Sequence, residues 1–479
     1  MRSTRRLFAA TMLLAAFAVA GCATSPLESI GDQVLAPAPI EYVPVDWSSP
    51  AERTLFASPA GTGSGASLEA PAALNTLLSS LQPGDRVLLL PGSYPSAKVV
   101  AKGTSAAPIR IEALHPVVTG PGLKLAATDR AVFRNTELKV TGSAFLRVQG
   151  IDFEVEPDQS GNGLTVRGSH DLAFVQNRFF QQSNTGLLLN GQPGADIRQV
   201  LVENNVFQNM IVEGEAGGIG AVRMDYGLRV HGGDTLVIRG NLFEGYFNHS
   251  LSLKEKTANV VIEKNRFELC GLVCIEGGQE PDTAHADVVT ERTIANIVVA
   301  DNSFDGLDDG TVGVFARNVE RIFVTGNRFA GISEPLRVAN NDRNSKNCAR
   351  QLYLVGRTFG GCEPDSRLTQ IGVGNRSVLF RSNQVEGDAR LLVAGRGYPD
   401  DVLVVSDSSA TGRVDICLRP FILNEAGFNR WTEGLPAVAE PPRLVLDRSP
   451  GFVVGPEPCL GKDLTHACEA DQSCSRMND

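Results

Sequence analysis

Aromatic side chains are scarce in this sequence, and an excess of positive charge is absent. Aromatic residues make up 6% of the 479 residues, with two tryptophans and six tyrosines, and the formal net charge is −10 at pH 7. This charge gives no indication of nucleic-acid binding, and it disfavours a polyanionic partner unless the binding face is locally basic. Any site that stacks rings on a ligand must rely on a few positions.

Motifs that identify common cofactor sites are also missing. The sequence has no pair of Cys-x-x-Cys motifs, no His-Glu-x-x-His motif and no glycine-rich phosphate loop between a strand and a helix. These absences disfavour a structural zinc site, a zinc protease and a nucleotide-binding domain. The 49 glycines instead separate short apolar segments, as glycines in turns do.

The first 22 residues have the pattern of a targeting segment. Arg2, Arg5 and Arg6 precede an apolar stretch, Leu7 to Ala18, that is too short to span a bilayer. The following Val19-Ala20-Gly21-Cys22 resembles the lipobox of bacterial lipoproteins. The resemblance implies cleavage before Cys22 and lipidation of its thiol.

We therefore expect residues 1–21 to be a lipoprotein signal peptide and the protein to lie in the bacterial cell envelope. Ala23 follows the cysteine where Asp would favour retention, so outer-membrane sorting is implied. The lipid anchor would be the membrane contact. An ordinary secretory signal with an incidental cysteine is the alternative.

The other cysteines predict disulfides. Eight remain after Cys22, an even number, and an exported chain favours their oxidation. Connectivity does not follow from the sequence, but nearest-neighbour pairing gives these candidates: Cys270–Cys274, Cys348–Cys362, Cys417–Cys459 and Cys468–Cys474.

A short phrase with two alternate apolar positions recurs along the chain. It reads Gly-Leu-Thr-Val-Arg-Gly at 163–168, Gly-Leu-Arg-Val-His-Gly at 227–232 and Ser-Leu-Ser-Leu-Lys-Glu at 250–255. A period of two is typical of strands and excludes helical repeats. A second marker, Asn-x-Phe, recurs from Asn177 to Asn327 at spacings of 28, 36, 24, 37 and 25 residues. The two repeats predict an all-β fold, a single right-handed parallel β-helix with insertions.

The marker residues suit structural roles. Asn tolerates the left-handed conformation of a corner, and its amide can bond to its own copy on the next turn. The Phe two residues later would point inward and stack.

Composition divides the chain into five parts. Residues 1–21 are the signal, and 22–50, rich in Pro, Ser and Ala, are expected to be a flexible tether. Residues 51–107 form an N-terminal cap and first turns, with a capping helix predicted over 67–81 by the spacing of its leucines. Residues 108–395 form the β-helix, and 396–479 form the last turns and a disulfide-pinned C-terminal cap.

Aligning copies of the phrase predicts a column of polar side chains on the outer surface. It contains Arg167, Asn190, His231, Lys254, Glu276 and Arg317. Two insertions, around 214–223 and 277–287, flank the turn that carries Lys254. Loops clustered on one face of a solenoid usually build its binding site, so function is expected there.

The stretch His249-Ser-Leu-Ser-Leu-Lys254 resembles the catalytic turn of polysaccharide lyase family six, which contains chondroitinase B and many alginate lyases. The resemblance implies that Ser252 and Lys254 belong to the active site and that the lysine removes the proton beside a uronic acid carboxylate. It also implies calcium. The expected arginine is absent, because Ile275 and Glu276 stand there, and the expected calcium carboxylates are absent at Phe247 and His249.

β-Elimination needs a base, a group that neutralises the carboxylate and an acid. Lys254 or His231 could be the base, His249 or His285 the acid, and Arg229, Arg167 or Arg317 could neutralise. Lys254 and Glu276 could instead form an outward ion pair worth under about 1 kcal/mol. Asn190, Gln279 and Tyr246 complete the expected substrate-binding set, and Tyr226 and Phe247 could also stack. Asp282, His285 and Asp287 form a weak candidate for a metal or acid–base cluster.

The sequence thus predicts an envelope-anchored monomer that binds an acidic polysaccharide and cleaves it by β-elimination. A glycoside hydrolase or uronate epimerase on the same fold is one alternative, with Glu276 paired with Asp225, Asp234, Glu280 or Asp282. A non-catalytic glycan-binding or envelope-structural protein is the other.

Overall fold

The computed structural model describes residues 37–119, 123–125, 129–155, 161–181, 184–191, 197–209, 226–254, 256–278, 294–307, 310–316, 319–338, 376–395, 402–420 and 443–455. The chain divides into two compact units, residues 1–36 and 37–479, and every element below belongs to the second.

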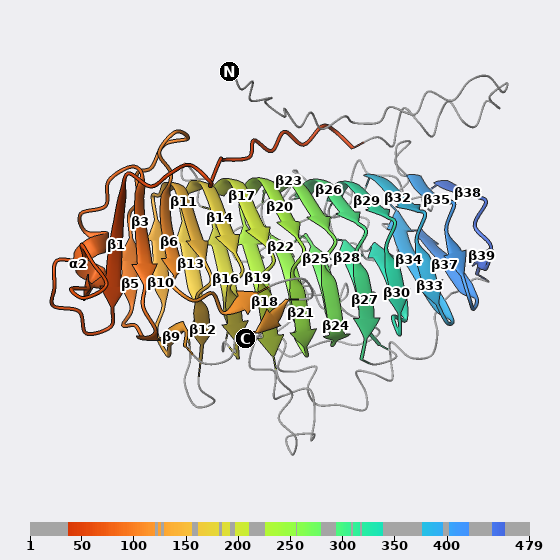
Figure 1. The fold of residues 1–479 in the computed structure, drawn as a ribbon. Helices are drawn as coiled ribbons and strands as arrows, with labels where there is room; N and C mark the ends of the chain where they lie inside the picture. The colour runs from red at the N-terminus through yellow and green to blue at the C-terminus, as the bar shows by residue number, and fades with distance from the viewer. Residues whose placement is uncertain are drawn as a thin grey trace, which may run out of the picture. The chain divides into compact units, whose positions relative to one another are not determined.

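This unit is a right-handed parallel β-helix built from three long parallel sheets, which confirms the predicted fold class (Figure 1). The first sheet, here sheet A, contains in spatial order β2 (Ala72–Ala73), β1 (Arg53–Ser58), β3 (Asp85–Leu89), β6 (Ile109–Ala113), β11 (Ala144–Gln149), β14 (His170–Val175), β17 (Ile197–Glu203), β20 (Gly233–Arg239), β23 (Thr257–Glu263), β26 (Ile294–Ala300), β29 (Val319–Thr325), β32 (Arg376–Arg381), β35 (Val402–Ser406) and β38 (Arg443–Asp447).

Sheet B contains β4 (Gly92–Ser93), β9 (Ala131–Arg134), β12 (Asp152–Glu154), β15 (Arg178–Phe180), β18 (Val206–Asn209), β21 (Leu242–Gly245), β24 (Arg266–Cys270), β27 (Ser303–Gly306), β30 (Arg328–Ala330), β33 (Gln384–Glu386) and β36 (Ser409–Ala410). Sheet C contains β5 (Ala97–Val99), β10 (Leu138–Thr141), β13 (Leu164–Arg167), β16 (Thr185–Asn190), β19 (Tyr226–His231), β22 (His249–Lys254), β25 (Val273–Gly277), β28 (Val312–Ala316), β31 (Glu334–Val338), β34 (Ala389–Gly395), β37 (Val414–Pro420) and β39 (Phe452–Val454). A short antiparallel pair, β7 (Val118–Thr119) and β8 (Lys124–Leu125), stands apart from the three sheets.

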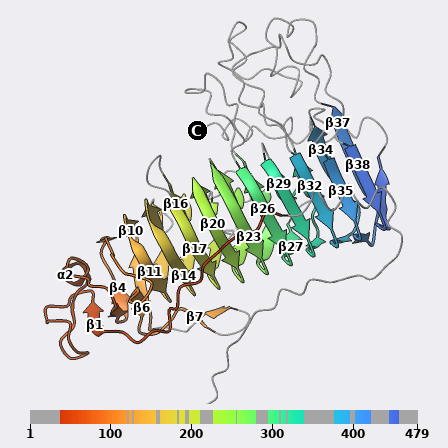
Figure 2. The ribbon, with the colours of Figure 1, turned by 90° about the horizontal axis from the view of Figure 1, so that it is seen from above.

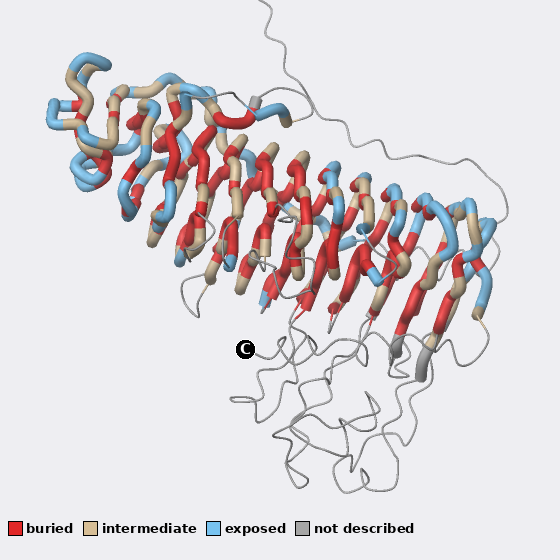
Figure 3. Tube along the Cα trace, turned by 90° about the horizontal axis from the view of Figure 1, so that it is seen from below, coloured by how far each residue is buried: buried red, intermediate tan, exposed pale blue. Residues whose placement is uncertain are grey.

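Aligned side chains from successive turns fill the interior. Figure 3 shows that buried residues follow the strands along the length of the coil. The phenylalanines of the Asn-x-Phe marker are fully buried, and the rings of Phe179, Phe207 and Phe243 stack with centroids 4.7 to 4.8 Å apart. Their inward position and stacking are confirmed. The spacing follows the distance of about 4.8 Å between neighbouring strands.

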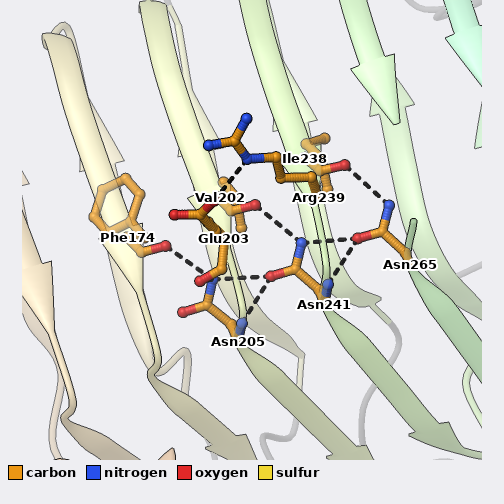
Figure 4. A network of polar contacts seen from close by, with 8 residues as sticks. All are labelled: Phe174, Val202, Glu203, Asn205, Ile238, Arg239, Asn241 and Asn265. Carbon is orange, nitrogen blue, oxygen red and sulfur yellow. Dashed lines mark hydrogen bonds and ion pairs between the residues drawn. The ribbon is translucent and has the colours of Figure 1, made fainter. Parts of the chain in front are cut away.

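The marker asparagines form a buried ladder, as predicted (Figure 4). The backbone N–H and the Nδ2 of Asn205 both donate to Oδ1 of Asn241, at 2.9 and 3.0 Å, and Asn241 donates in the same way to Asn265. Each Nδ2 also donates to a backbone carbonyl, such as that of Val202 for Asn241. The left-handed residue is not the marker itself but the one before it, for example Asn204 with φ of 54°.

The predicted N-terminal helix is much shorter than 67–81. Helix α2 covers only Leu74–Leu78, and its three buried leucines join the core. The residues before it cannot be helical, because Ala72 and Ala73 form β2 and pair with Ala57 and Ser58 of β1. Of the leucines with helical spacing, only those of α2 are therefore helical, whereas Leu68 lies in a turn and Leu81 lies beyond the helix.

Residues 38–47, here the strap, cross the outer face of sheet A (Figure 2). The strap is bonded to side chains of the sheet at three places: Ala38 with Asn296, Val43 with Gln199, and Trp47 with Arg110. These partners lie on β26, β17 and β6. Six strand spacings separate β26 from β6, roughly 29 Å, and nine extended residues span about 30 Å. The strap is therefore largely extended, with one tight turn in which the N–H of Tyr42 donates to the carbonyl of Ile40, although it falls within the expected tether.

Two rings attach the strap to the sheet. Tyr42 and Trp47 pack against an apolar patch that includes Ala173, Leu201 and Val237. Burial raises the pKa of Tyr42 to about 12. The strap therefore joins the folded body through apolar packing as well as hydrogen bonds.

One predicted disulfide is confirmed, between Cys270 and Cys274. Cys417 is also disulfide-bonded. The other disulfide candidates lie outside the described residues: Cys348, Cys362, Cys459, Cys468 and Cys474. Cys22, the predicted lipidation site, also lies outside them. In the described part of the chain, every helix is too short to cross a membrane.

Sheet B carries a buried acid on its outer side. Asp152 is fully buried and lies between Arg130, with which it forms an ion pair, and Arg178 Nη1 at 3.4 Å. Burial raises the pKa of Asp152 from 3.8 to about 6, because the desolvation of the carboxylate outweighs the attraction of the arginines.

This shift predicts a pH-dependent effect of Asp152→Asn on stability. Between pH 4 and 6 the folded protein binds the proton of Asp152 more tightly than the unfolded chain, so the wild type loses stability as the pH rises through this window. Denaturant unfolding should show the variant gaining up to about 3 kcal/mol over the wild type above pH 6, with the gain vanishing below pH 4. A difference that does not vary with pH would contradict the assignment.

The asparagine ladder predicts a large cost for Asn241→Ala. The change removes the acceptor of two buried donors on Asn205. It also removes the Nδ2 that donates to Oδ1 of Asn265 and to the carbonyl of Val202, while the backbone N–H of residue 241 still donates to Asn265. We expect the free energy of unfolding to fall by about 3 kcal/mol, measured in urea. Asn75→Ala is the control, because Asn75 is exposed, and its effect should stay within about 0.5 kcal/mol. Equal effects would argue against the ladder.

Candidate functional site

Four of the six predicted column residues align on the outer face of sheet C. Arg167 pairs with Asn190, Asn190 with His231, and His231 with Lys254 in the strand register. Four consecutive strands thus place one polar side chain each in a single line along the coil. Arg317 lies outside the described residues.

The predicted position of Glu276 in this column is wrong by two residues. Glu276 lies opposite Ser252, and Leu251 opposite Ile275. The predicted column places Glu276 beside Lys254, 22 residues earlier. The turn is 24 residues long, which is the spacing of the paired asparagines Asn241 and Asn265. Leu251 and Ile275 each follow their marker asparagine by ten residues, a signal in the sequence that gives the correct register. Glu276 belongs to the neighbouring column, with Arg229 and Ser252.

In this register, three polar side chains surround one carboxylate oxygen of Glu276. Oε2 of Glu276 accepts a hydrogen bond from Ser252 Oγ at 2.9 Å and from Lys254 Nζ at 2.5 Å, and His249 Nε2 lies 3.4 Å away. Glu276 and Ser252 are at most 1% exposed and Lys254 is 8% exposed. The ion pair is therefore buried, not an outward pair in water. A buried pair of this kind is held by hydrogen bonds to both partners.

Aromatic and cationic groups border this cluster on one side. The ring of Tyr226 stacks on the imidazole of His249, with centroids 5.3 Å apart and planes 9° apart. The guanidinium of Arg229 lies 4.4 Å from the centre of the Tyr226 ring. This contact fixes a positive charge beside the cluster.

Other predicted residues lie elsewhere. Tyr246 lies in the corner between β21 and β22, packed close to Gly271, and Phe247 is buried in the core. Asp234, a possible partner of Glu276 in hydrolysis, is on sheet A and bonded to Asn259. Six candidates lie outside the described residues: Asp225, Gln279, Glu280, Asp282, His285 and Asp287.

The residues around Lys254 do not fit calcium. The carboxylate at this turn, Glu276, directs Oε2 to the amine of Lys254, and a calcium site needs several oxygen ligands. Phe247 stands at one of the expected ligand positions, with its ring in the core. No three His, Cys, Asp or Glu side chains converge as metal ligands within the described ranges.

A second charged cluster on sheet C was missed by the sequence analysis. Glu334, also 1% exposed, forms ion pairs with Arg337 through one oxygen and with Arg390 through the other. Burial alone would raise the pKa of Glu334, but the hydrogen bonds and charges of both arginines outweigh it and lower the pKa. Arg337 also lies over the ring of Phe315, 5.5 Å from its centre.

Charge is distributed unevenly between the sheets. The strands of sheet C from β5 to β34 contain two acidic residues, Glu276 and Glu334, and seven basic ones: Lys98, Lys139, Arg167, Arg229, Lys254, Arg337 and Arg390. The strands of sheet B contain four basic residues, Arg134, Arg178, Arg266 and Arg328, and six acidic ones: Asp152, Glu154, Glu244, Glu268, Asp305 and Glu386. Sheet C is thus locally basic in a chain with a net charge of −10.

Residues 132–329 match the family described as "Right handed beta helix region". None of the curated proteins matches the sequence. Several solved structures are similar to this chain. An alginate lyase from Paenibacillus sp. str. FPU-7 is 13% identical, with a TM-score of 0.36, and the match covers 85% of this chain and 99% of that one.

A GH136 lacto-N-biosidase from Eubacterium ramulus is 11% identical, with a TM-score of 0.46 and coverage of 84% and 68%. PfbA, a surface adhesin of Streptococcus pneumoniae, is 13% identical, with a TM-score of 0.38 and coverage of 78% and 93%. These likenesses do not bear on the reaction or the ligand of this chain.

The buried cluster predicts strong coupling between Lys254 and Glu276. Lys254→Met leaves a buried carboxylate without its cation and should lower the free energy of unfolding by about 3 kcal/mol. Glu276→Gln should also destabilise, and the double variant should be little worse than either single one, a coupling of about 2 kcal/mol in a double-mutant cycle.

The exposed pair Arg328–Glu386, with both side chains 44% exposed, is the control for this cycle. Its coupling should be below about 1 kcal/mol. Additive effects at Lys254 and Glu276 would contradict the buried pair.

Proposed function

We propose that this protein binds an acidic polysaccharide along the outer face of sheet C and cleaves it by β-elimination at the turns of β19, β22 and β25. The observation that carries the proposal is the cluster on Glu276. It fixes Lys254 and His249 beside each other, one strand from His231. Fixed amine and imidazole groups next to a basic surface suit proton transfer on an anionic sugar.

The local charge supports an anionic ligand. The net charge of −10 disfavours a polyanion, but sheet C has a basic excess, whereas sheet B has an acidic one. A basic face on an acidic protein attracts and orients a polyanion toward that face.

His231 is the better base of the two predicted candidates. The amine of Lys254 donates to Glu276 at 2.5 Å, a geometry that favours the ammonium, which has no lone pair to accept a proton. His231 is partly exposed and is the strand neighbour of Lys254. A neutral imidazole there could take the proton from C5 of a uronate.

The remaining roles follow from position. Arg229 would neutralise the uronate carboxylate as charge develops on it. His249, beside the carboxylate of Glu276, would supply a proton to the leaving O4. In balance, the C5–H bond breaks and its proton moves to His231, a C4=C5 double bond forms, and the C4–O4 bond breaks as O4 gains a proton. Glu276 would position these groups without touching the sugar.

Hydrolysis by paired carboxylates has less support. Such enzymes need two carboxyl groups that face the bond between them. Of the acids within the described strands β5 to β34 of sheet C, Glu276 and Glu334 are each buried and bound to cations. Binding without cleavage is the second candidate. It is favoured by the contacts on Glu276, because a carboxylate held by three side chains would suit a rigid binding surface as well as a catalytic site.

Purified protein should raise the ultraviolet absorbance of at least one polymer among alginate, pectate and glycosaminoglycans, because elimination creates a conjugated double bond. His231→Ala should reduce kcat by at least about 100-fold. His170→Ala is the control, since that imidazole lies on sheet A beside Asp171, and activity should not change.

Two outcomes would contradict elimination. Release of reducing ends without absorbance would indicate hydrolysis. Binding of a polymer without any cleavage would leave a glycan-binding protein.

A further inference from the structure

The Glu334 cluster holds more positive charge than its carboxylate needs. Each oxygen of Glu334 is bound by one arginine: Nε of Arg337 contacts one, and Nε and Nη2 of Arg390 contact the other. One arginine would suffice to neutralise one buried carboxylate. Two arginines leave a net charge of +1 at the surface of sheet C.

Neighbouring acids do not remove this excess. Asp415 is the strand neighbour of Arg390, but its Oδ1 is engaged by Nε of Arg413 at 2.8 Å. Within the described part of the chain, Nη1 and Nη2 of Arg337 and Nη1 of Arg390 contact no acceptor. Both guanidinium groups are reachable, because the side chains of Arg337 and Arg390 are 21% and 26% exposed.

The two arginines are held in fixed directions. Glu334 is buried and anchors both through its two oxygens, while the ring of Phe315 supports the guanidinium of Arg337 from the side. A guanidinium with free N–H groups and a fixed plane is suited to bind a carboxylate or sulfate through paired hydrogen bonds.

This cluster lies on the line of the proposed active site. Glu276 is the strand neighbour of Phe315, and Phe315 is the strand neighbour of Arg337. Arg337 therefore lies two strands, about 10 Å, from Glu276 along the coil. Arg229 lies two strands away on the opposite side, in the same column.

We propose that Arg337 and Arg390 form a binding subsite for an acidic group of a glycan, a carboxylate or a sulfate, beyond the turn that carries Glu276. The inference rests on the proposed function for the identity of the ligand, but not on cleavage. Glu334 is the positioning residue of this subsite. The glycan would lie parallel to the axis of the coil, with one charged group at Arg337 and Arg390 and another at Arg229.

The test uses the full chain and a variant that leaves no unpaired charge in the cluster. Replacing the arginines alone would leave Glu334 buried without a cation, so the variant is Glu334→Gln with Arg337→Gln and Arg390→Gln. It removes a net charge of +1 while keeping a neutral polar side chain at all three positions. Arg328→Gln on sheet B is the control for loss of one surface charge.

Calorimetric binding of an oligouronate and of a sulfated oligosaccharide should be measured at two salt concentrations. The triple variant should bind at least one of them about 10-fold more weakly than the wild type, with a smaller dependence on salt, and Arg328→Gln should bind like the wild type. Weakening with the uronate identifies a carboxylate, and weakening with the sulfated sugar identifies a sulfate.

Wild-type affinity for both sugars in a triple variant that unfolds at the wild-type temperature would overturn the subsite. That result, together with cleavage that depends on His231, would leave the proposed function standing. Conversely, weaker binding in the triple variant with no cleavage by the wild type would support the subsite and contradict elimination.

Discussion

The shared hydrogen bond between successive marker asparagines is the constraint on which the rest of the molecule depends. One Oδ1 accepts both the backbone N–H and the Nδ2 of the previous marker, in a fully buried position. Neither donor can bond to water there, so losing the bond would be costly. The bond therefore fixes the register of each turn relative to the next. The bond forms between Asn241 and Asn265, which are 24 residues apart. It also forms between Asn327 and Asn383, 56 residues apart, although Val385 replaces the phenylalanine of the marker there. The length of chain between markers can therefore vary without changing the alignment of the sheets.

Because the register between turns is fixed, equivalent side chains on the outer face of sheet C lie in columns with a regular spacing. Most side chains on the outside of a solenoid are solvated, yet Glu276 and Glu334 are both 1% exposed. Each of these carboxylates is bound by more than one basic or polar group. Glu334 binds Arg337, which lies over the ring of Phe315, and the Glu276 cluster borders Tyr226, whose ring lies under Arg229. The scarcity of aromatic residues in the sequence does not weaken this surface, because a few rings are placed where charges need support.

Much of the fold followed from the sequence because its signals are local. The period of two, the marker asparagines and the stacked phenylalanines each depend on neighbouring residues or on a simple repeat. The register of Glu276 was harder, since a slide of two residues keeps the apolar positions inward and leaves the pattern intact. The capping helix was overestimated because pairing of β2 with β1 overrides the helical spacing of leucines.

The Glu334 cluster could not be found in this way. Its bond from Arg390 joins residues 56 apart in the sequence, and neither residue carries a motif. Only the order of strands in sheet C brings them together. The position of Lys254 in its column could be predicted from the sequence. Whether its amine can act as a base depends on its contact with Glu276, and the predicted register placed Glu276 in the wrong column.

The strap has a mechanical consequence. The strap runs from Asn296 on β26 along sheet A to Arg110 on β6 and leads into the first turn. A tensile load on the amino-terminal end therefore meets the coil in its middle and acts along the axis, as shear on contacts spread over seven strands. Shear loads many bonds at once, whereas a pull on the first turn would break them one after another. The contacts of the strap therefore take up a pulling force before it reaches the first strand, and they protect that strand from being detached.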